Sequence, residues 1–337
     1  MKIFVTGCTG YIGSHTCVEL LEKGYEVIGL DNFSNSKKDV LDRIKTITDK
    51  EIKFYEGNML DKELLDKIFN ENEIDVVIDF AAYKSVGDSV KAPIEYYTNN
   101  VSSVLTLLTV MKEHNVKSIV FSSSATVYGK PEFVPITEEA KTGGTTNPYG
   151  TSKLYVEGIL KDLYEADKEF NICIFRYFNP VGAHKSGLIG EEPNGVPANL
   201  MPYISKVATG ELECLNVFGD DYDTLDGTGV RDYIHVVDLA KAHVNGVEKI
   251  FDRTGGLLIY NLGTGCGYSV LEMIKAFEKV NNVKVNYKIA PRRDGDIAEC
   301  YADSSKAEKE LNWRAELGLE DMCKDSYNFT VNRKNKN

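Results

Sequence analysis

KIFVTGCTGYIGSHTCVELLEKGYEVIGLD, residues 2–31, is the stretch of sequence that decides the fold. It begins with a short apolar run at 2–6 and ends with a second one at 26–31. Between the two runs, a helical pattern of apolar residues extends over 11–23. A strand, a helix and a second strand in such close succession predict two parallel strands joined by a helix that covers one face of their sheet.

The alternation of strand and helix continues to about residue 179. The further predicted strands are 52–56, 75–80, 117–122 and 171–177, and the further predicted helices are 61–70, 94–114 and 150–167. Strands that alternate with helices in this way indicate a doubly wound α/β fold with a parallel, Rossmann-type sheet.

The pattern changes in the second half of the chain. Stretches rich in Gly, Pro, Asn and Asp occur at 180–198 and 219–229, and helical patterns occur at 200–209, 237–251, 270–280 and 304–311. We expect a Rossmann domain over 1–179, to which segments at about 230–260 return. A smaller mixed α/β domain, mainly 180–330, would lie over the carboxyl edge of the sheet, where ligands of such sheets bind. The polar residues 331–337 are expected to form a frayed tail.

Composition and charge limit the classes of function. The 337 residues are 42% hydrophobic and 27% charged, which is typical of a globular protein. The formal net charge of −12 disfavours nucleic acid and anionic membranes as partners. No uncharged apolar run reaches about 18 residues, so we expect no membrane helix, and the first residues resemble a strand more than a signal peptide. The seven cysteines form no C-x-x-C pair, which indicates reduced thiols in the cytoplasm and neither a disulfide framework nor a metal site.

Three glycines separate the first predicted strand from the first helix. Gly7 permits a tight turn, Gly10 lets a pyrophosphate approach the backbone, and Gly13 lets the helix pack close to the strand. A Gly-rich turn without a ligand would show the same spacing. However, Asp31 ends the next strand, at the distance expected for a carboxylate that binds the ribose hydroxyls of adenosine. Because a carboxylate there repels a ribose phosphate, the pattern favours NAD over NADP.

A second group of polar residues indicates proton chemistry. Tyr149 and Lys153 are spaced i, i+4 at the start of a predicted helix, so both side chains lie on one face, one turn apart. A nearby ammonium favours the phenolate, and we therefore expect a lowered pKa for Tyr149. Ser124 follows a buried strand and can hydrogen-bond a reacting hydroxyl at the same edge of the sheet. A surface tyrosine with a solvated lysine, and a Ser-rich turn, are the alternative interpretations of these patterns.

Together these features resemble the short-chain dehydrogenase/reductase family, in its extended branch of NAD-dependent epimerases that act on nucleotide sugars. The resemblance covers about residues 2–330. It extends to the segments 80–84 (FAAYK), 99–100 (NN), 122–129 (SSSATVYG), 176–180 (RYFNP), 199–203 (NLMPY), 227–235 (GTGVRDYIH), 261–263 (NLG), 291–293 (PRR) and 295–296 (GD).

The resemblance implies a role for each matching residue. The catalytic group is Ser124, Tyr149 and Lys153. The NAD-binding residues are Gly7, Gly10, Tyr11, Ile12, Gly13, Asp31, Asn32, Asn35, Ser36, Asn58, Met59, Phe80, Ala81, Lys84, Asn99, Ser124, Tyr149, Lys153 and Phe178. The UDP-sugar-binding residues are Ser124, Tyr149, Asn179, Asn199, Leu200, Asn216, Phe218, Arg231, Tyr233, Arg293, Asp296 and Cys300.

Two arginines among these residues are assigned to the diphosphate of the substrate. Arg231 and Arg293 would bind the diphosphate, because a planar guanidinium pairs with phosphate oxygens through two hydrogen bonds. A structural ion pair is the alternative for Arg231.

The family usually has Asp followed by Ile or Val where this chain has Asn58 and Met59. An amide can still bond to an adenine edge, so the departure bears on the affinity for NAD more than on its binding.

The implied reaction is inversion of carbon 4 in UDP-galactose and UDP-glucose through a 4-keto intermediate. Tyr149 would remove the proton of the 4-hydroxyl with Ser124 as a bridge, while a hydride passes to NAD and later returns to the other face of the sugar. The rivals are a nucleotide-sugar 4,6-dehydratase, a uronic-acid epimerase and a non-catalytic NAD-binding scaffold. The dehydratases carry two carboxylates after the residue that corresponds to Ser124, whereas this chain has Ala125 and Thr126.

The helical patterns at 94–114 and 150–167 predict a second chain as partner. Both have apolar residues over more than one stripe, which indicates a further packing partner; they are Val104, Leu105, Leu107, Leu108, Leu154, Val156, Ile159 and Leu160. The resemblance implies a homodimer in which these helices form a four-helix bundle. A loop of the same chain over the extra face is the alternative.

Cys300 bears on the range of substrates. In the family a bulky tyrosine at this position goes with UDP-glucose and UDP-galactose alone, and a small residue also admits the 2-acetamido sugars. The resemblance therefore implies that UDP-N-acetylglucosamine and UDP-N-acetylgalactosamine are substrates as well. A buried cysteine without influence on substrate choice is the alternative.

Overall fold

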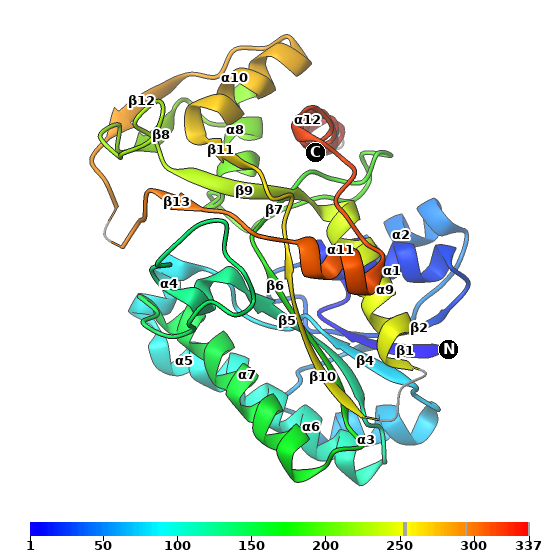
Figure 1. Ribbon diagram of the computed structural model, residues 1–337. Coiled ribbons are helices and arrows are strands. Elements are labelled where there is room, and N and C mark those ends of the chain that lie inside the picture. The colour runs from blue at the N-terminus through cyan, green and yellow to red at the C-terminus, as the bar shows by residue number, and fades with distance from the viewer. Residues whose placement is uncertain (252–254, 294, 336–337) are drawn as a thin grey trace.

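The computed structural model describes residues 1–251, 255–293 and 295–335 (Figure 1). At its centre is a parallel seven-stranded sheet with the strand order β10-β6-β5-β4-β1-β2-β3. Its strands are β1 (Lys2–Thr6), β2 (Glu26–Asp31), β3 (Lys53–Glu56), β4 (Val76–Asp79), β5 (Ser118–Ser124), β6 (Asn171–Tyr177) and β10 (Gly256–Leu262). The order reverses between β1 and β4, which is where ligands of such sheets bind. The predicted doubly wound α/β fold is confirmed.

Helices cover both faces of this sheet because its strands are apolar on both sides. One face carries α1 (Tyr11–Glu22), α2 (Val40–Thr48) and α9 (Val236–Phe251), and the other carries α3 (Lys62–Glu71), α6 (Ser103–Glu113) and α7 (Pro148–Ala166). The short helices α4 (Val86–Lys91) and α5 (Pro93–Tyr97) pack on α7. Figure 1 shows α3, α6 and α7 side by side below the sheet. A 3₁₀ turn, η2 (Ala125–Tyr128), follows β5.

The predicted helix over 94–114 is interrupted. Between α5 and α6 lies a π-helical turn, η1 (Thr98–Ser102). This turn orients the buried side chain of Asn100, whose Oδ1 accepts from the N–H of Tyr83 (2.8 Å) and whose Nδ2 donates to the Ser152 hydroxyl of α7 (3.1 Å). The interruption thus joins the loop after β4 to the helix that bears Tyr149.

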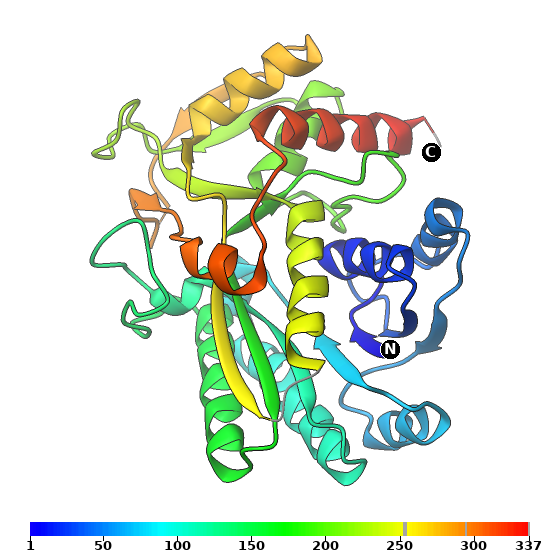
Figure 2. The same cartoon turned by 45° about the vertical axis from the view of Figure 1, so that its right-hand side comes forward.

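The second half of the chain contributes elements, which we call the cap, that form sheets apart from the central one. Its sheets combine β7 (Asn179–Val181), β9 (Val230–His235), β11 (Gly267–Ser269) and β13 (Glu299–Cys300), and pair β8 (Leu215–Phe218) with β12 (Tyr287–Ala290). Its helices are α8 (Leu200–Ala208), α10 (Val270–Asn281) and α12 (Leu319–Lys334). Figure 2 shows α12 beside the other helices of the cap, and these elements enclose an apolar core of their own.

The segments at about 230–260, which we expected to return to the Rossmann domain, divide between the two parts of the structure. Within 230–260, β9 stays in the cap, whereas α9 and β10 complete the central sheet layer, and α11 (Ser305–Leu311) also packs on α9 and β10. Residues 331–334, expected in a frayed tail, form the last turn of α12. Residues 336 and 337 of that tail lie outside the described residues.

Two properties of the chain concern its surroundings. None of the described helices combines the length and the apolar character that crossing a membrane requires. All seven cysteines are free thiols.

Candidate active site

A glycine-lined turn between β1 and α1 forms one wall of the main cavity. Gly7 has a φ of +64°, and a Cβ on Gly13 would lie 2.2 Å from the carbonyl oxygen of Gly7. The helix therefore approaches the turn more closely than any side chain allows. No side chain caps α1, whose N-cap is Gly10. Its first N–H groups are thus available to an anion in the cavity, where the helix dipole also favours negative charge.

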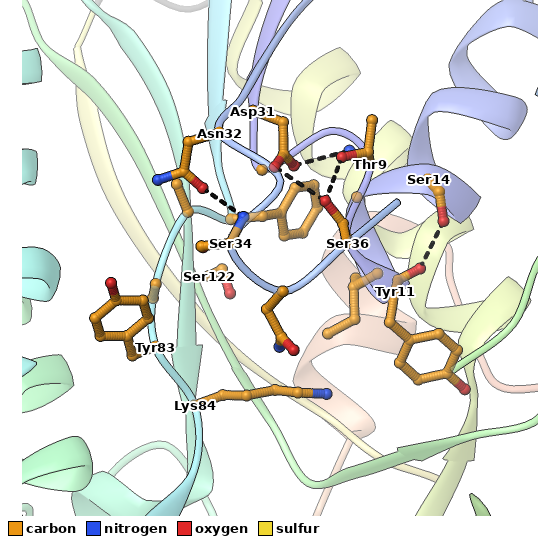
Figure 3. A pocket seen from close by; sticks show the side chains of 18 of the residues that line it. Thr9, Tyr11, Ser14, Asp31, Asn32, Ser34, Ser36, Tyr83, Lys84 and Ser122 are labelled. Atoms are coloured by element: carbon orange, nitrogen blue, oxygen red, sulfur yellow. Dashed lines mark hydrogen bonds between the residues drawn. The ribbon is translucent and has the colours of Figure 1, made fainter. Parts of the chain in front are cut away.

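Asp31 lies at the end of β2, beside this turn (Figure 3). One carboxylate oxygen accepts from the N–H of Thr9 (3.1 Å), and the other accepts from the N–H of Phe33 (2.9 Å) and the Ser36 hydroxyl (3.1 Å). An ionised carboxylate has about four acceptor positions. These three bonds fix the orientation of Asp31 and leave an acceptor position for a ribose hydroxyl.

Almost all residues assigned to NAD by sequence line this one cavity. They are Gly7, Gly10, Tyr11, Ile12, Gly13, Asp31, Asn32, Asn35, Ser36, Asn58, Met59, Phe80, Ala81, Lys84, Asn99, Tyr149 and Lys153. Ser124 and Phe178 are not among its lining residues; Phe178 is buried in the apolar cluster beside η2. The tight glycine turn, the free helix N-terminus and the Asp31 carboxylate fit a dinucleotide with a free ribose.

The side chains of the proposed catalytic group come together at the end of β5. Asn147 caps α7 by accepting from the N–H of Gly150 (2.9 Å), which places Tyr149 in the first helical turn. Tyr149 is hydrogen-bonded to Ser124. Lys153 donates to the carbonyl oxygen of Ser122 at 2.7 Å.

The electrostatics of this group differ from the expectation. Burial raises the pKa of Tyr149, and the hydrogen bond from Ser124 only partly offsets it, so the expected lowering by Lys153 is wrong for this structure. Burial also lowers the pKa of Lys153 to about 8, against the attraction of the Asp79 carboxylate. Desolvation is the largest influence on the pKa of both groups. Tyr149 is thus a phenol, and Lys153 can lose its proton close to neutral pH.

The loop between β7 and α8 contributes a wall that the sequence did not predict. Glu191 lines the cavity and accepts from Lys84 Nζ (2.7 Å) and from Asn199 Nδ2 (2.6 Å). It thereby joins a residue assigned to NAD with one assigned to the UDP-sugar.

Its neighbour Glu192 is bound to three cations. It pairs with Lys37 (2.6 Å), Arg43 (3.1 Å) and Arg333 of α12 (2.9 Å). Burial acts to raise the pKa of Glu192, but the hydrogen bonds to these cations outweigh it and lower the pKa. Glu191 and Glu192 lie in a Gly- and Pro-rich loop that shows no hydrophobic periodicity. The only sequence signal for their place in the site is therefore that two glutamates occur in succession.

Ser122 and Tyr177 are two further cavity residues that the sequence assignment omitted. Their hydroxyl groups are hydrogen-bonded to each other. Both lie in segments that carry the family resemblance, and Tyr177 is the register partner of Ser124 across β5 and β6. Strand alternation could have found Ser122, since it lies on the same side of β5 as Ser124.

The residues assigned to the UDP-sugar form a separate group in the cap. Arg293 Nε donates to Asp296 Oδ2 (2.9 Å), and Arg231 Nη2 lies 4.0 Å from the other oxygen of the same carboxylate. The guanidinium of Arg293 also lies over the ring of Phe218, 4.9 Å from its centroid. Asp296 thus holds two guanidinium groups close together, an arrangement that suits a diphosphate. The ion pair considered as the alternative for Arg231 exists, but it is long.

The other cap residues lie on the strands and helix around this pair. Asn179 of β7 is the register partner of Tyr233 in β9, and Cys300 of β13 is the register partner of Arg231. Asn199 and Leu200 begin α8, and Asn216 lies in β8 with its buried Oδ1 unpartnered. None of the twelve residues except Tyr149 lines the dinucleotide cavity. The structure therefore divides the predicted site into the dinucleotide cavity and a group of residues in the cap.

Comparison with known proteins identifies relatives over nearly the whole chain. A family model described as GDP-mannose 4,6 dehydratase matches residues 4–326. The chain is 61% identical to UDP-glucose 4-epimerase of Haemophilus influenzae over 332 residues, 98% of each chain. It is 52% identical to UDP-glucose 4-epimerase of Homo sapiens, over 97% of this chain and 96% of the relative.

A solved structure shows the same fold. The crystal structure of UDP-glucose 4-epimerase from Bifidobacterium longum in complex with NAD⁺ and UDP superposes with a TM-score of 0.96. Its sequence is 59% identical, and the match covers 99% of each chain.

Proposed function

Because this chain belongs to the UDP-glucose 4-epimerase family of extended short-chain dehydrogenases/reductases, we infer that it interconverts UDP-galactose and UDP-glucose with bound NAD. The observation that carries this inference is the single cavity in which the dinucleotide turn and Asp31 meet Tyr149 and Lys153. The family model is described as a dehydratase, but the two residues after Ser124 are Ala125 and Thr126. Neither can supply the carboxylates that dehydration requires.

NAD fits the described residues, and it would accept a hydride from carbon 4 of the sugar and return it. The first N–H groups of α1 would bind its pyrophosphate, and Asp31 would accept from the adenosine ribose. Lys84, Asn99 and the 80–84 backbone would line the remainder of the dinucleotide.

The chain's own residues move the proton and hold the substrate. Tyr149 transfers a proton between its phenol oxygen and the sugar 4-hydroxyl, and Ser124, which is already bonded to Tyr149, bridges the two. Lys153, one helical turn away, donates to the carbonyl oxygen of Ser122 and holds its amino group beside the catalytic pair, where its protonated form would favour a phenolate against the burial that raises the Tyr149 pKa. Arg231 and Arg293 bind the diphosphate in the cap, so the sugar itself is held loosely enough to present either face to the cavity.

The direct test is incubation of the purified protein with UDP-galactose and no added cofactor. We expect UDP-glucose to form, and denaturation of the same sample to release NAD(H) in roughly equal proportion to the chain. A 4-keto-6-deoxy product would identify a dehydratase instead. An NAD-loaded protein that leaves UDP-galactose unchanged would contradict the proposal.

Acceptance of the 2-acetamido sugars is a finer part of the proposal, and Cys300 supports it. Its half-buried side chain packs beside the cluster that contains Phe178 and Ala125, next to the position of Ser124. A thiol leaves volume there that a tyrosine ring would fill, and an acetamido group needs that volume. Cys300→Tyr should abolish turnover of UDP-N-acetylgalactosamine and retain that of UDP-galactose. A wild-type protein inactive on the acetamido sugar would contradict this part.

The homodimer and the cytoplasmic location are also proposed. Of the apolar residues named for the dimer, Val104, Leu107, Leu108, Val156 and Leu160 are buried in their own chain, and Leu154 packs on the cluster beside η2. The support is therefore narrower than expected: Leu105 is 45% exposed, Tyr155 is 55% exposed, and Tyr155 stacks on Tyr97. The seven free thiols agree with a reducing compartment.

A further inference from the structure

A buried ion pair lies beneath the proposed catalytic group and has no assigned role. Arg176 of β6 donates from Nε to Glu157 Oε1 (2.9 Å) and from Nη2 to Oε2 (2.6 Å), a two-pronged contact. The side chains are 2% and 0% exposed. Arg176 belongs to one of the segments that carry the family resemblance, yet it does not line the dinucleotide cavity, and none of its hydrogen bonds among the described residues goes to Arg231, Arg293 or Asp296.

Glu157 connects the helix and the strand that bear the catalytic group. It lies on α7, one turn after Lys153 and two turns after Tyr149, so the three side chains share a face. The hydroxyl of Ser123 donates to Glu157 Oε1 at 2.6 Å. Ser123 is flanked in β5 by Ser122, whose carbonyl binds Lys153, and by Ser124, which binds Tyr149.

The other end of the ion pair reaches two more elements. Arg176 Nη1 donates to the hydroxyl of Tyr128 in η2 (3.0 Å), and that hydroxyl donates to Asn261 Oδ1 in β10 (2.7 Å). Asn261 also donates from Nδ2 to the carbonyl oxygen of Ile136 (2.8 Å). The network therefore joins α7, β5, β6, β10 and η2 around the end of β5.

Burial of an ion pair is a poor way to gain stability. Removal of two charges from water carries a large desolvation cost, and apolar side chains of similar volume often stabilise a protein as well or better. A pair of this kind does restrict geometry, because a guanidinium and a carboxylate with two hydrogen bonds accept one relative orientation. The network thus fixes how far α7 can slide or rotate against β5.

We propose that Glu157 is a positioning residue: with Arg176 it sets the register of α7 on β5 and so holds Tyr149 against Ser124. This inference rests on the proposed epimerase function. It does not require Glu157 to touch substrate or cofactor. A displacement of about 1 Å at a reacting group can cost on the order of 10²-fold in rate, so a small slip of α7 is enough to matter.

The first test is Glu157→Gln, which keeps the shape and removes the charge. We expect kcat for UDP-galactose to fall on the order of 10- to 100-fold, because Tyr149 loses its fixed distance to Ser124. KM should stay within about twofold and the NAD content should not change, because the side chains of Glu157 and Arg176 bond to each other, to Ser123 and to Tyr128, and neither residue lines the dinucleotide cavity. Equal loss in kcat and in NAD content would mean general damage and would overturn the proposal.

The pH profile separates positioning from stability. Since the Ser124 bond lowers the pKa of Tyr149, a longer bond in Glu157→Gln should move the tyrosine limb of the kcat profile to higher pH. Asp238→Asn is the matched control: this buried carboxylate of α9 accepts from the N–H groups of Glu316 and Leu317 on the other face of the sheet. It should lower the urea midpoint without a shift of the profile.

The double substitution Glu157→Leu with Arg176→Leu decides between the two roles. It removes both buried charges, and Lys161, whose Nζ lies 3.8 Å from Glu157 Oε2, is 39% exposed and stays hydrated without that partner. We therefore expect a urea midpoint near that of the wild type. Turnover should remain low if the pair positions α7, and wild-type turnover in this variant would overturn the proposal. A wild-type protein inactive on UDP-galactose would instead refute the epimerase function, so the two failures are distinguishable.

Discussion

Tyr149 is the residue on which the proposed proton chemistry depends. Tyr149→Phe keeps the ring and removes the hydroxyl, so turnover of UDP-galactose should fall by a factor on the order of 10² to 10⁴. Binding of UDP should hardly change, because the arginine pair in the cap contacts neither residue of the Tyr149–Ser124 bond. Steady-state kinetics and calorimetric titration with UDP measure the two effects. Near-normal turnover would show that another group moves the proton.

Lys153 gives a prediction about stability and pH. Its folded-state pKa of about 8 lies below the unfolded value of about 10.4, so the unfolded chain binds more protons between these two values. This group therefore makes the protein more stable as the pH rises from 8 to 10. Lys153→Met should remove that contribution and also impair turnover. Urea unfolding of both proteins at about pH 8 and at about pH 10, the two ends of this interval, measures the difference. An unchanged pH dependence in Lys153→Met would contradict it.

At the residue scale, almost all residues that the sequence assigned to NAD line one cavity, and their roles stay predictions. Asp31, Tyr149 and Lys153 follow from local spacing, since each lies at a fixed distance from a turn or helix start. Glu191 and Glu192 could not be predicted, because their partners Lys84, Arg43 and Arg333 are distant in the chain and meet only in the fold. The raised pKa of Tyr149 could not be predicted from the sequence either, because it is caused by burial, which depends on tertiary packing and not on residue spacing.

Among the elements, α1 depends most on the absence of a side chain. Gly13→Ala would place a Cβ 2.2 Å from a backbone oxygen, so α1 must move away from the Gly7 turn. We expect loss of bound NAD(H) and a destabilisation of about 1–3 kcal/mol. Gly87→Ala is the control, since a Cβ there has no neighbour within 4 Å, and it should be neutral or slightly stabilising. NAD release on denaturation and urea unfolding compare the variants. Retention of NAD by Gly13→Ala would contradict the close-packing argument.

Strong periodicity made the main helices and strands of the first half predictable. The cap sheets were not predictable, because β7, β11 and β13 have two or three residues each and pair with a strand far away in the sequence. Such short strands are defined by their partners and carry no alternation of their own. The packing of α11 on α9 and β10 was not predictable for the same reason, because it depends on partners that are distant in the sequence.

For the whole molecule, the proposed homodimer predicts a mass twice that of the 37.6 kDa chain. Leu105→Glu would place a charge in the exposed face of α6 and should yield monomers in light scattering at micromolar concentration. Leu225→Glu is the control, because Leu225 is 99% exposed on a cap loop away from α6. A monomeric wild type, or a dimer that both substitutions leave intact, would refute this interface.

The π-helical turn η1 has a consequence for insertions and deletions. A π turn contains about one residue more than an α turn, so loss of a single residue from 98–102 would allow a regular helix from Pro93 to Glu113. That deletion would close the wide turn, while α5 and α6 would keep nearly their present relative register, because the π turn absorbs the extra residue locally. Asn99 would turn from the cavity and Asn100 from Tyr83 and Ser152. We therefore expect the deletion variant to have the more regular helix and to be inactive. The site thus depends on the extra residue in η1.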